Sequence, residues 1–499
     1  MRATEGDERV VQRRGHGLPE PVHFIGIGGA GMSAIALVLA RLGVHVTGSD
    51  LKVSRYTRLI EAAGAVVRVG HDEANLGEAT LVVISSAVPE SNVELVEARR
   101  RGLPVLQRAE MLARVMAMRR GIAVAGTHGK TTTSSMIAHV LHECGCDPTF
   151  LIGGEVNDRG SNAGVGEGQW LVAEADESDG SLLYLRPEVA VITNVELDHH
   201  SHYACVQDVH DVFRRFAALL PADGRLVLVE GGGGEFLAAA SPAPVTLCGL
   251  LPDGQASPAG DAAYRAAVRH VDDTGSDFVV WRDDRQLARV TLRVPGEHNI
   301  MNALCAIAVL EHAGVPVHQA AAPLATFTGA GRRFQETGRQ NGVLVVDDYA
   351  HHPSELAATL RAAKLGDHRR VIAVFQPHLY SRTRYLQREF GRALTLADEA
   401  VVTDVFAARE EPEPGITGKL LVDAYLTERP GGPVAYMPRL TDVVRHLSAH
   451  VRAGDLVLTL GAGDVFRAGE ELLVALRSQG TDAAGGEVTS GEGSAPKPG

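Results

Sequence analysis

A lysine-containing loop between an apolar segment and a helical segment constrains this chain most. Residues 121–125 are apolar and typical of a short buried strand, and residues 134–141 have the composition of a helix. Between them stand Gly126, Thr127, His128, Gly129, Lys130, Thr131 and Thr132. Glycines let backbone N–H groups approach an anion, and the N-terminus of a helix adds partial positive charge. The pattern predicts a phosphate-binding loop, in which Lys130 reaches a β- or γ-phosphate and Thr131 offers its hydroxyl to Mg²⁺.

The spacing of this lysine loop differs from that of the ordinary P-loop. The first glycine of the common pattern would fall at position 124, which is Val124, so the turn is the shorter Gly-x-x-Gly-Lys-Thr. The alternative is a glycine-rich turn between a strand and a helix with a surface lysine. We favour phosphate binding because Lys130 stands where the helix begins.

A second glycine pattern lies near the N-terminus. The strand-like residues 22–25 lead into Gly26-x-Gly28-x-x-Gly31, which also contains Gly29 and Ala30, and residues 32–42 are helical in pattern. A second strand over residues 44–49, including Ser49, ends at Asp50. An acid about 20 residues after the glycines is typical of a dinucleotide-binding unit. We expect a nucleotide-type ligand of open identity, with Asp50 either on a ribose hydroxyl or capping the next turn.

Polar side chains follow several further strands that the sequence predicts. Ser85 and Ser86 follow the apolar residues 81–84, and open α/β sheets bind ligands at such strand ends. A polar turn before Pro89 explains these two serines equally well.

Acidic residues and histidines follow two strands after the lysine loop. Glu174 begins an acidic run after residues 170–173, and carboxylates beside an ATP loop suit Mg²⁺. The run is alternatively a solvated turn. His199 lies in a histidine-rich segment after residues 189–192. Because no cysteine or Glu-x-x-His spacing accompanies it, we favour a Mg²⁺-site histidine over structural zinc.

Strands and helices alternate again in the last third of the chain. Residues 343–346, 371–375, 400–402 and 456–460 are strand-like, which predicts a parallel sheet. Polar clusters follow all four, including Asp348, Tyr349 and His351 after the first strand and His378 and Arg382 after the second. Four clusters at one sheet edge indicate a ligand site. Before this unit, His298, Asn299 and Asn302 stand at a loop–helix junction, where they either read an adenine edge or cap the helix.

Length and composition set the broad class of the protein. A chain of 499 residues with 45% hydrophobic residues is expected to hold about three domains at about 150 residues each. The net charge of −13 argues against nucleic acid as a partner, and no apolar run approaches the length of a membrane span. Five scattered cysteines without a CxxC pair fit a reducing, cytoplasmic setting.

Taken together, these motifs resemble the Mur ligase family over residues 21–475. The resemblance rests on residues 126–133, 194–199 and 331–334, and on Gly296-Glu297-His298-Asn299 with Asn302. It implies an α/β fold with three domains. They are a Rossmann-like UDP-sugar-binding domain (21–118), a central P-loop-type ATP-binding domain with a parallel sheet (119–329) and a Rossmann-like amino-acid-binding domain (330–477). The ends, 1–20 and 478–499, are expected to be a disordered extension and tail.

Within the family, the chain resembles the members that join L-alanine to the carboxylate of UDP-N-acetylmuramate through an acyl phosphate, releasing ADP and phosphate in peptidoglycan precursor synthesis. The reasons are residues 347–353 and 375–378. Relatives that attach a tripeptide would carry Phe at position 349. One departure is Leu379, where an arginine is expected, so that Arg382 or Arg384 must supply the missing cation. Rival hypotheses are an NAD-dependent oxidoreductase, resting on Gly26 to Asp50, and a nucleotide-gated regulator.

The resemblance also implies roles for individual residues. The cofactors implied are ATP and Mg²⁺, and the oligomeric state stays open. Catalytic roles are implied for Lys130, His199, Arg332, His351 and Arg382. ATP would be bound by Gly126, Thr127, His128, Gly129, Lys130, Thr131, Thr132, His298, Asn299, Asn302 and Arg332. The UDP-sugar would be bound by Gly28, Gly29, Ala30, Gly31, Ser49, Asp50, Ser85 and Ser86. The amino acid would be bound by Asp348, Tyr349, His351, His378 and Arg382, and the metal by Thr131, Glu174 and His199.

Overall fold

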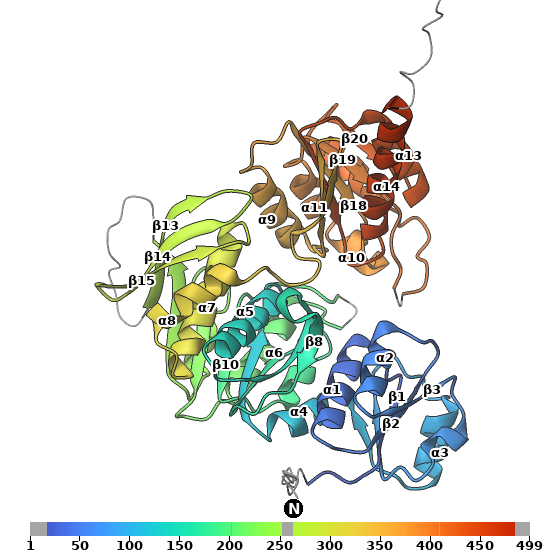
Figure 1. The fold of residues 1–499 in the computed structure, drawn as a ribbon, viewed down its shortest axis with the longest axis vertical. Helices are drawn as coiled ribbons and strands as arrows, with labels where there is room; N and C mark the ends of the chain where they lie inside the picture. Colours follow the sequence, from blue (N-terminus) through green and yellow to red (C-terminus); the bar gives the residue numbers. More distant parts are fainter. Residues whose placement is uncertain (1–16, 201, 252–262, 409, 485–499) are drawn as a thin grey trace, which may run out of the picture.

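Three sheets, each covered by helices, follow one another along the chain. The structure is a computed structural model that describes residues 17–200, 202–251, 263–408 and 410–484. Figure 1 shows the region that contains β10 and α5 lying between the N-terminal region and the C-terminal region. The predicted α/β class with parallel-sheet cores is confirmed. The chain changes sheet between α4 and β6 and again between α8 and β16, while the domain limits proposed from the sequence stay predictions.

The N-terminal region is a five-stranded, fully parallel sheet in the order β3-β2-β1-β4-β5. Its strands are β1 (Val22–Ile25), β2 (Val46–Asp50), β3 (Val66–Val69), β4 (Leu81–Ile84) and β5 (Val105–Gln107), and its helices are α1 (Ala30–Arg41), α2 (Arg55–Ala62), α3 (Val93–Arg100) and α4 (Arg108–Met116). Because β1 lies between β2 and β4, the glycine loop after β1 sits where the strand order reverses, which is where such sheets bind ligands. Helix α1 begins two residues earlier, and β2 two residues later, than the sequence predicted.

The central region is built on a ten-stranded sheet in which β6 lies between β10 and β9. The strands are β6 (Arg120–Ala125), β7 (Thr149–Val156), β8 (Ser161–Gly164), β9 (Trp170–Glu174), β10 (Val189–Ile192), β11 (Arg225–Val229), β12 (Val245–Leu250), β13 (Ala263–Val271), β14 (Ser276–Arg282) and β15 (Arg285–Leu292), and the helices are α5 (Lys130–Glu143), α6 (Val206–Ala217), α7 (Glu297–His312) and α8 (Val317–Thr326). The lysine loop therefore leaves the middle of the sheet. Helices α5 and α7 bury most of their surface in one core. The segment after β11 contributes β12, and residues 252–262 lie outside the described ranges.

The C-terminal region has six strands in the order β16-β17-β21-β18-β19-β20. They are β16 (Gln335–Gln340), β17 (Val343–Asp348), β18 (Arg370–Phe375), β19 (Glu399–Val402), β20 (Val434–Tyr436) and β21 (Asp455–Leu460), and the helices are α9 (Pro353–Ala363), α10 (Tyr380–Tyr385), α11 (Gln387–Leu394), α12 (Lys419–Glu428), α13 (Leu440–His450) and α14 (Phe466–Ala484). The predicted parallel sheet is correct except for β16, which runs antiparallel to β17. Helix α14 continues to Ala484, past residue 478, where the tail was predicted to start. The rest of the predicted tail and the first sixteen residues lie outside the described ranges.

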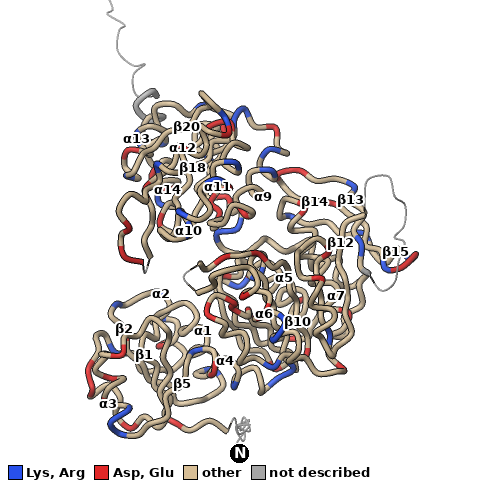
Figure 2. The backbone as a smooth tube through the Cα atoms, turned by 180° about the vertical axis from the view of Figure 1, so that it is seen from behind, with Lys and Arg blue, Asp and Glu red and all other residues tan. Residues whose placement is uncertain are grey.

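Basic and acidic residues are interspersed along the backbone of all three regions, as the colours of Figure 2 show. Among the described helices, none combines the length and the apolar character that crossing a membrane requires. The regions contact each other through specific polar groups. Arg55 of the N-terminal region lies 2.6 Å from Glu155 of the central region, and Arg382 of the C-terminal region forms a buried ion pair with Asp198 of the central region. These contacts join the central region to each of the other two regions.

Candidate active site

The ammonium group of Lys130 is held over its own loop by hydrogen-bond acceptors from three residues. Its Nζ atom donates to both carboxylate oxygens of Glu177, at 3.0 and 2.9 Å, and to the backbone oxygens of Gly126 and Thr127, at 2.5 and 3.1 Å. Burial alone would lower the pKa of Lys130, but the negative charges of Glu177 and Asp176 outweigh burial and raise it. The ammonium group is therefore charged and placed where a phosphate over the loop would meet it.

Positions 126 and 129 of the lysine loop require glycine for two reasons: both have a positive φ angle, and a Cβ atom would clash with a neighbouring side chain. Gly126 has φ +125°, and a Cβ there would lie 2.1 Å from Thr193 Oγ1. Gly129 has φ +80°, and its Cβ would lie 2.8 Å from Asn302 Oδ1. The loop is further fixed by the His128 amide, which donates to Asn194 Oδ1 at 2.9 Å. The shorter turn is thus closed against the loop after β10 and against α7.

The three residues predicted to hold a metal lie at the same edge of the sheet. Glu174 ends β9 beside the lysine loop, accepts a hydrogen bond from the Gly153 amide at 2.7 Å, and is also hydrogen-bonded by Thr131. Burial raises the pKa of Glu174 despite these hydrogen bonds and the nearby charge of Lys130. His199, at φ +54°, has its Nε2 atom 3.6 Å from Glu177. A hydroxyl, a buried carboxylate and an imidazole are a donor set that a divalent cation can use.

A cavity of about 670 Å³ opens beside the lysine loop, between the central and the C-terminal regions. Its volume is in the range of pockets for small molecules and cofactors. It is lined by many of the residues predicted to bind ATP, namely His128, Gly129, Thr132, His298, Asn299 and Asn302. Asn299 Nδ2 also donates to the Pro295 carbonyl at 2.7 Å, and Asn302 Nδ2 donates to Asn299 Oδ1 at 3.1 Å. These amides therefore brace the start of α7 while they line the cavity.

Of the two neighbouring arginines, it is Arg333 that lines this cavity. Arg332, which was predicted to reach the phosphates, instead has its Nε atom 2.8 Å from Asp347 and donates to the backbone oxygens of Gly461 and Gly463. Arg333 forms a 3.1 Å ion pair with Glu355. The phosphate contact of Arg332 stays a prediction that this conformation does not display.

Four of the five residues predicted to bind the amino acid surround the end of β17. Asp348 accepts the amides of Phe334 and Ala350 at 2.9 and 2.7 Å, and burial raises its pKa to about 6. Tyr349 lies under the guanidinium groups of both arginines. The rings of Tyr349 and His351 are 5.3 Å apart, and those of His351 and His378 are 5.9 Å apart. Burial lowers the pKa of His351 to about 3 and that of His378 to about 4, so both imidazoles are neutral at pH 7.

The fifth residue, Arg382, is already engaged by a carboxylate. Its Nε and Nη2 atoms lie 3.0 and 3.1 Å from the two oxygens of Asp198, and both side chains are almost fully buried. Arg384, the other candidate cation, pairs with Glu413 at 2.7 Å. Leu379 has φ +71°, in a region that favours glycine, and its amide donates to the Phe406 carbonyl at 3.0 Å. In this conformation both arginines proposed to bind the amino-acid carboxylate are occupied.

The N-terminal glycine loop has its own polar supports. Gly28 donates its amide to Asp50 Oδ2 at 2.8 Å, and Ser49 donates to Glu94 Oε2 at 2.6 Å. The carbonyl of Ala30 accepts from Asn162 of the central region at 3.2 Å. Asp50 thus holds the loop in shape, a role that the alternatives weighed for the sequence did not include. The strand predicted before Ser85 and Ser86 is present as β4, so both serines stand at the C-terminal end of a strand, as expected.

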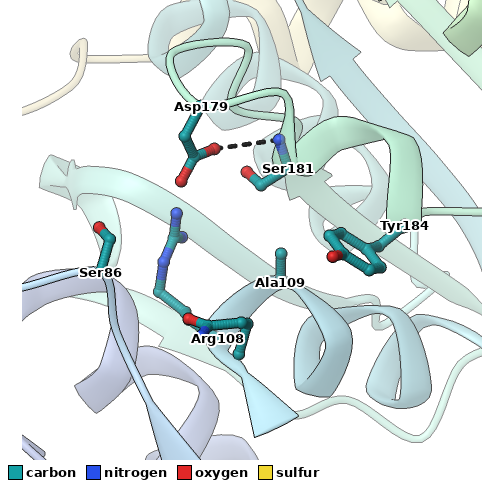
Figure 3. Close-up of a pocket in the computed structure, with 7 residues that line it drawn as sticks. Ser86, Arg108, Ala109, Asp179, Ser181 and Tyr184 are labelled. Carbon is teal, nitrogen blue, oxygen red and sulfur yellow. Dashed lines mark hydrogen bonds between the residues drawn. The ribbon is translucent and has the colours of Figure 1, made fainter. Parts of the chain in front are cut away.

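A smaller cavity, of about 170 Å³, lies where the N-terminal and central regions meet. Figure 3 shows Arg108 between Ser86 and Asp179, with Ser181 donating its amide to Asp179 at 3.0 Å. A Cβ on Gly31 would lie 3.0 Å from Arg108 Nη1, and Arg108 Nη2 is 3.5 Å from Asp176. Arg108, which lines this cavity, was not among the predicted site residues, although it directly follows the edge strand β5.

Comparison with known proteins gives one consistent family. Family models match residues 21–120 (Mur ligase family, catalytic domain), 124–310 (Mur ligase middle domain) and 332–463 (Mur ligase, glutamate ligase domain). A Rubrobacter xylanophilus protein called UDP-N-acetylmuramate--L-alanine ligase is 51% identical over 461 residues, which are 91% of this chain and 100% of that protein. One of the same name from Pelotomaculum thermopropionicum is 47% identical over 91% of this chain and 97% of its own length.

Two solved structures share the fold over nearly the whole chain. The UDP-N-acetylmuramate-alanine ligase of Thermotoga maritima is 28% identical, with a TM-score of 0.75 over 92% of this chain and 99% of that one. A murein peptide ligase from Psychrobacter arcticus is 27% identical, with a TM-score of 0.65 over 94% of this chain and 99% of that one.

Proposed function

Because the chain belongs to the Mur ligase family, we propose that it joins L-alanine to the carboxylate of UDP-N-acetylmuramate at the expense of ATP. The reaction forms an amide bond and releases ADP and phosphate, and it serves peptidoglycan precursor synthesis. The observation that carries the proposal is the placement of Lys130. This charged lysine belongs to the loop that borders a large cavity sized for a nucleotide, and Asp348 of the polar cluster at the end of β17 lines the same cavity.

A carboxylate is a poor electrophile, so the chemistry needs activation before the amine can attack. Transfer of the γ-phosphoryl group of ATP to the sugar carboxylate gives an acyl phosphate, and Lys130 neutralises charge on that group during the transfer. The alanine nitrogen then attacks the acyl carbon, and phosphate leaves. The three reactants have to meet in one cleft, and the contacts among the three regions supply that proximity.

Thr131, Glu174 and His199 are the residues that we propose hold Mg²⁺. They fit the ion because Thr131 and Glu174 offer hard oxygen atoms. Burial raises the pKa of the Glu174 carboxylate, and a bound cation would lower that pKa again. When bound, Mg²⁺ neutralises phosphate charge and orients the γ-phosphoryl group.

The amino acid side of the site is proposed at Asp348, Tyr349, His351, His378 and Arg382. His351 is neutral at pH 7 and is therefore able to accept a proton from the alanine ammonium group, although its low pKa makes it a weak base. For Arg382 to contact the alanine carboxylate, it must share or leave Asp198. We place the reaction in the cytoplasm, since ATP and UDP-sugars are cytoplasmic metabolites.

The test measures phosphate release with each substrate omitted in turn. We expect release only when ATP, UDP-N-acetylmuramate and L-alanine are all present, and little release when glycine, L-serine or a tripeptide replaces L-alanine. Release with the tripeptide at the rate seen with L-alanine would instead assign the chain to the recycling ligases. Release without any amino acid would contradict ligation altogether.

A further inference from the structure

Two histidines and a glutamate converge from three separate segments beside the lysine loop. His128 comes from the loop, Glu196 from the segment after β10, and His352 from the residue before α9. One ligand atom from each lies within 4.8 Å of the others. His128 Nε2 and His352 Nδ1 are each 3.7 Å from Glu196 Oε2. Ligands of one tetrahedral ion with bonds of about 2.1 Å are about 3.4 Å apart, so the three groups would have to approach one another by up to about 1.4 Å to hold an ion.

Within the part of the chain that the structure describes, three ring nitrogens of this cluster make no hydrogen bond, whereas His352 Nδ1 accepts the Ser354 amide at 3.4 Å, so the open nitrogen of His352 is Nε2. Both ring nitrogens of His128 and the Nε2 atom of His352 are buried and make no hydrogen bond among the described residues. The His352 side chain is 5% exposed, and the two rings lie 4.6 Å apart. Buried polar atoms are nearly always paired, so three buried nitrogens without a hydrogen bond require an explanation, although His128 also faces the carboxylates of Glu196 and Glu355.

Neighbouring groups are arranged as a second shell around the cluster. His128 Nδ1 lies 3.5 Å from Glu355, on the side of the ring away from Glu196. Ser354 Oγ donates to Glu196 Oε2 at 2.6 Å. Metal-binding histidines usually direct their second nitrogen at a carboxylate, and ligating carboxylates are usually hydrogen-bonded in turn.

We propose that His128, Glu196 and His352 form a binding site for a transition-metal ion of the Zn²⁺, Co²⁺ or Ni²⁺ class. Two imidazoles and one carboxylate favour these ions over Mg²⁺, which prefers oxygen ligands. The fourth position faces the large cavity, because His128 and Glu196 both line that cavity. The site is distinct from the proposed Mg²⁺ residues Thr131, Glu174 and His199. A bound ion would tie the lysine loop to the first turn of α9 and so hold the C-terminal region against the central one.

Co²⁺ is the probe for this site, because its visible absorption reports coordination directly. The protein without nucleotide is titrated with Co²⁺ in a large excess of Mg²⁺, which keeps Co²⁺ off the oxygen-rich site. We expect one equivalent of Co²⁺ to bind with the intense absorption of a four-coordinate complex. His352→Asn should weaken this binding by more than about 100-fold, beyond the loss that an outer-shell change causes. Asparagine is a good N-cap, so α9 keeps its capping group.

Two further variants separate a metal ligand from a structural histidine. Glu196→Gln should lose the Co²⁺ absorption as His352→Asn does, and both should keep the wild-type melting temperature in the absence of metal to within a few degrees. His318→Asn, an exposed position on α8, is the matched control and should bind Co²⁺ like the wild type. The proposal is overturned if His352→Asn binds Co²⁺ with the wild-type affinity and spectrum, or if excess Mg²⁺ removes all Co²⁺.

Discussion

The two glycine loops of this protein occupy equivalent places in their sheets but are supported by opposite means. Each follows a strand that lies between two parallel neighbours, and each runs into a helix. The N-terminal loop has no lysine, and its Gly28 amide is held by Asp50. The central loop carries Lys130, which donates to Glu177 and is further stabilised by the negative charges of Asp176 and Glu174.

This difference matches what each loop is proposed to do. A diphosphate that is only held needs backbone amides and a helix N-terminus, and it stays bonded throughout the reaction. A γ-phosphoryl group that is transferred gains charge at the moment of transfer, so its loop needs a cation fixed in place. We therefore propose substrate binding for one loop and charge neutralisation for the other, and substitutions test each proposal.

Replacement of Lys130 by alanine should have the largest effect. Loss of the ammonium group removes the charge that offsets the transferring phosphoryl group, so ligation should fall by about 1,000-fold or more. UDP-N-acetylmuramate binding, which we assign to the other loop, should stay within about twofold, less than a lost hydrogen bond costs. Phosphate release and equilibrium binding of the UDP-sugar measure the two quantities separately. Lys419→Ala, at an exposed pair with Asp423, is the control; ligation by Lys130→Ala at the control's rate would refute the assignment.

The glycines of the two loops should differ in how they tolerate a methyl group. Gly126→Ala places a Cβ 2.1 Å from Thr193 Oγ1 at φ +125° and should lower the free energy of unfolding by about 3 kcal/mol. Gly29, at φ −65°, has only an ordinary 3.5 Å contact, so Gly29→Ala should cost less than about 1 kcal/mol. Chemical denaturation of both variants tests this, and equal destabilisation would contradict the steric argument.

The region of the N-terminal loop should be sensitive to acid through Glu94, which accepts a hydrogen bond from Ser49 next to Asp50. Burial would raise the pKa of Glu94, but hydrogen bonds from His23, Ser49 and Asn75 outweigh it and lower the pKa to about 2. Since the folded pKa is below that of the unfolded chain, the stabilisation is complete above about pH 4.5 and is lost as the pH falls toward 2. It amounts to about 2 to 3 kcal/mol.

The matching variant is Glu94→Gln, with exposed Glu78→Gln as its control. Melting temperatures measured from pH 7 down to pH 3 should show Glu94→Gln less stable at pH 7, with the deficit shrinking as the pH falls. A deficit that is constant over this range would show that the loss is not electrostatic.

Most of the fold, but less of the site, could be predicted from the sequence. Apolar strands such as β4 and β10 have the bounds that the sequence predicted, because buried parallel strands are continuous apolar runs. Strand β16 (Gln335–Gln340) was missed because it is polar and exposed at the sheet edge, and β20 because it has only three residues.

The partners of site residues were missed for a different reason. Glu177 under Lys130, Asp198 on Arg382 and Asp50 on Gly28 are contacts between segments far apart in the chain or around tight turns. Spacing predicts which side chains gather at a sheet edge, but it does not predict which pairs form there. The occupied state of Arg382 and the position of Arg332 beside Asp347 could be learned only from the structure.

The smallest expected effect is that of substitutions at Asp50 on UDP-sugar binding. They test whether the support of the N-terminal loop by Asp50 contributes to ligand binding. Asp50 Oδ2 accepts the Gly28 amide, which is also a candidate donor to the diphosphate. If the carboxylate braces the loop and holds a ribose hydroxyl, Asp50→Ala should weaken UDP-N-acetylmuramate binding about tenfold, the value of one or two hydrogen bonds. Asp50→Asn keeps an acceptor for the amide and should weaken binding less. Tighter binding by Asp50→Ala would instead mean that the Asp50 carboxylate competes with the diphosphate for the Gly28 amide. In that case the hydrogen bond that stabilises the loop would weaken ligand binding.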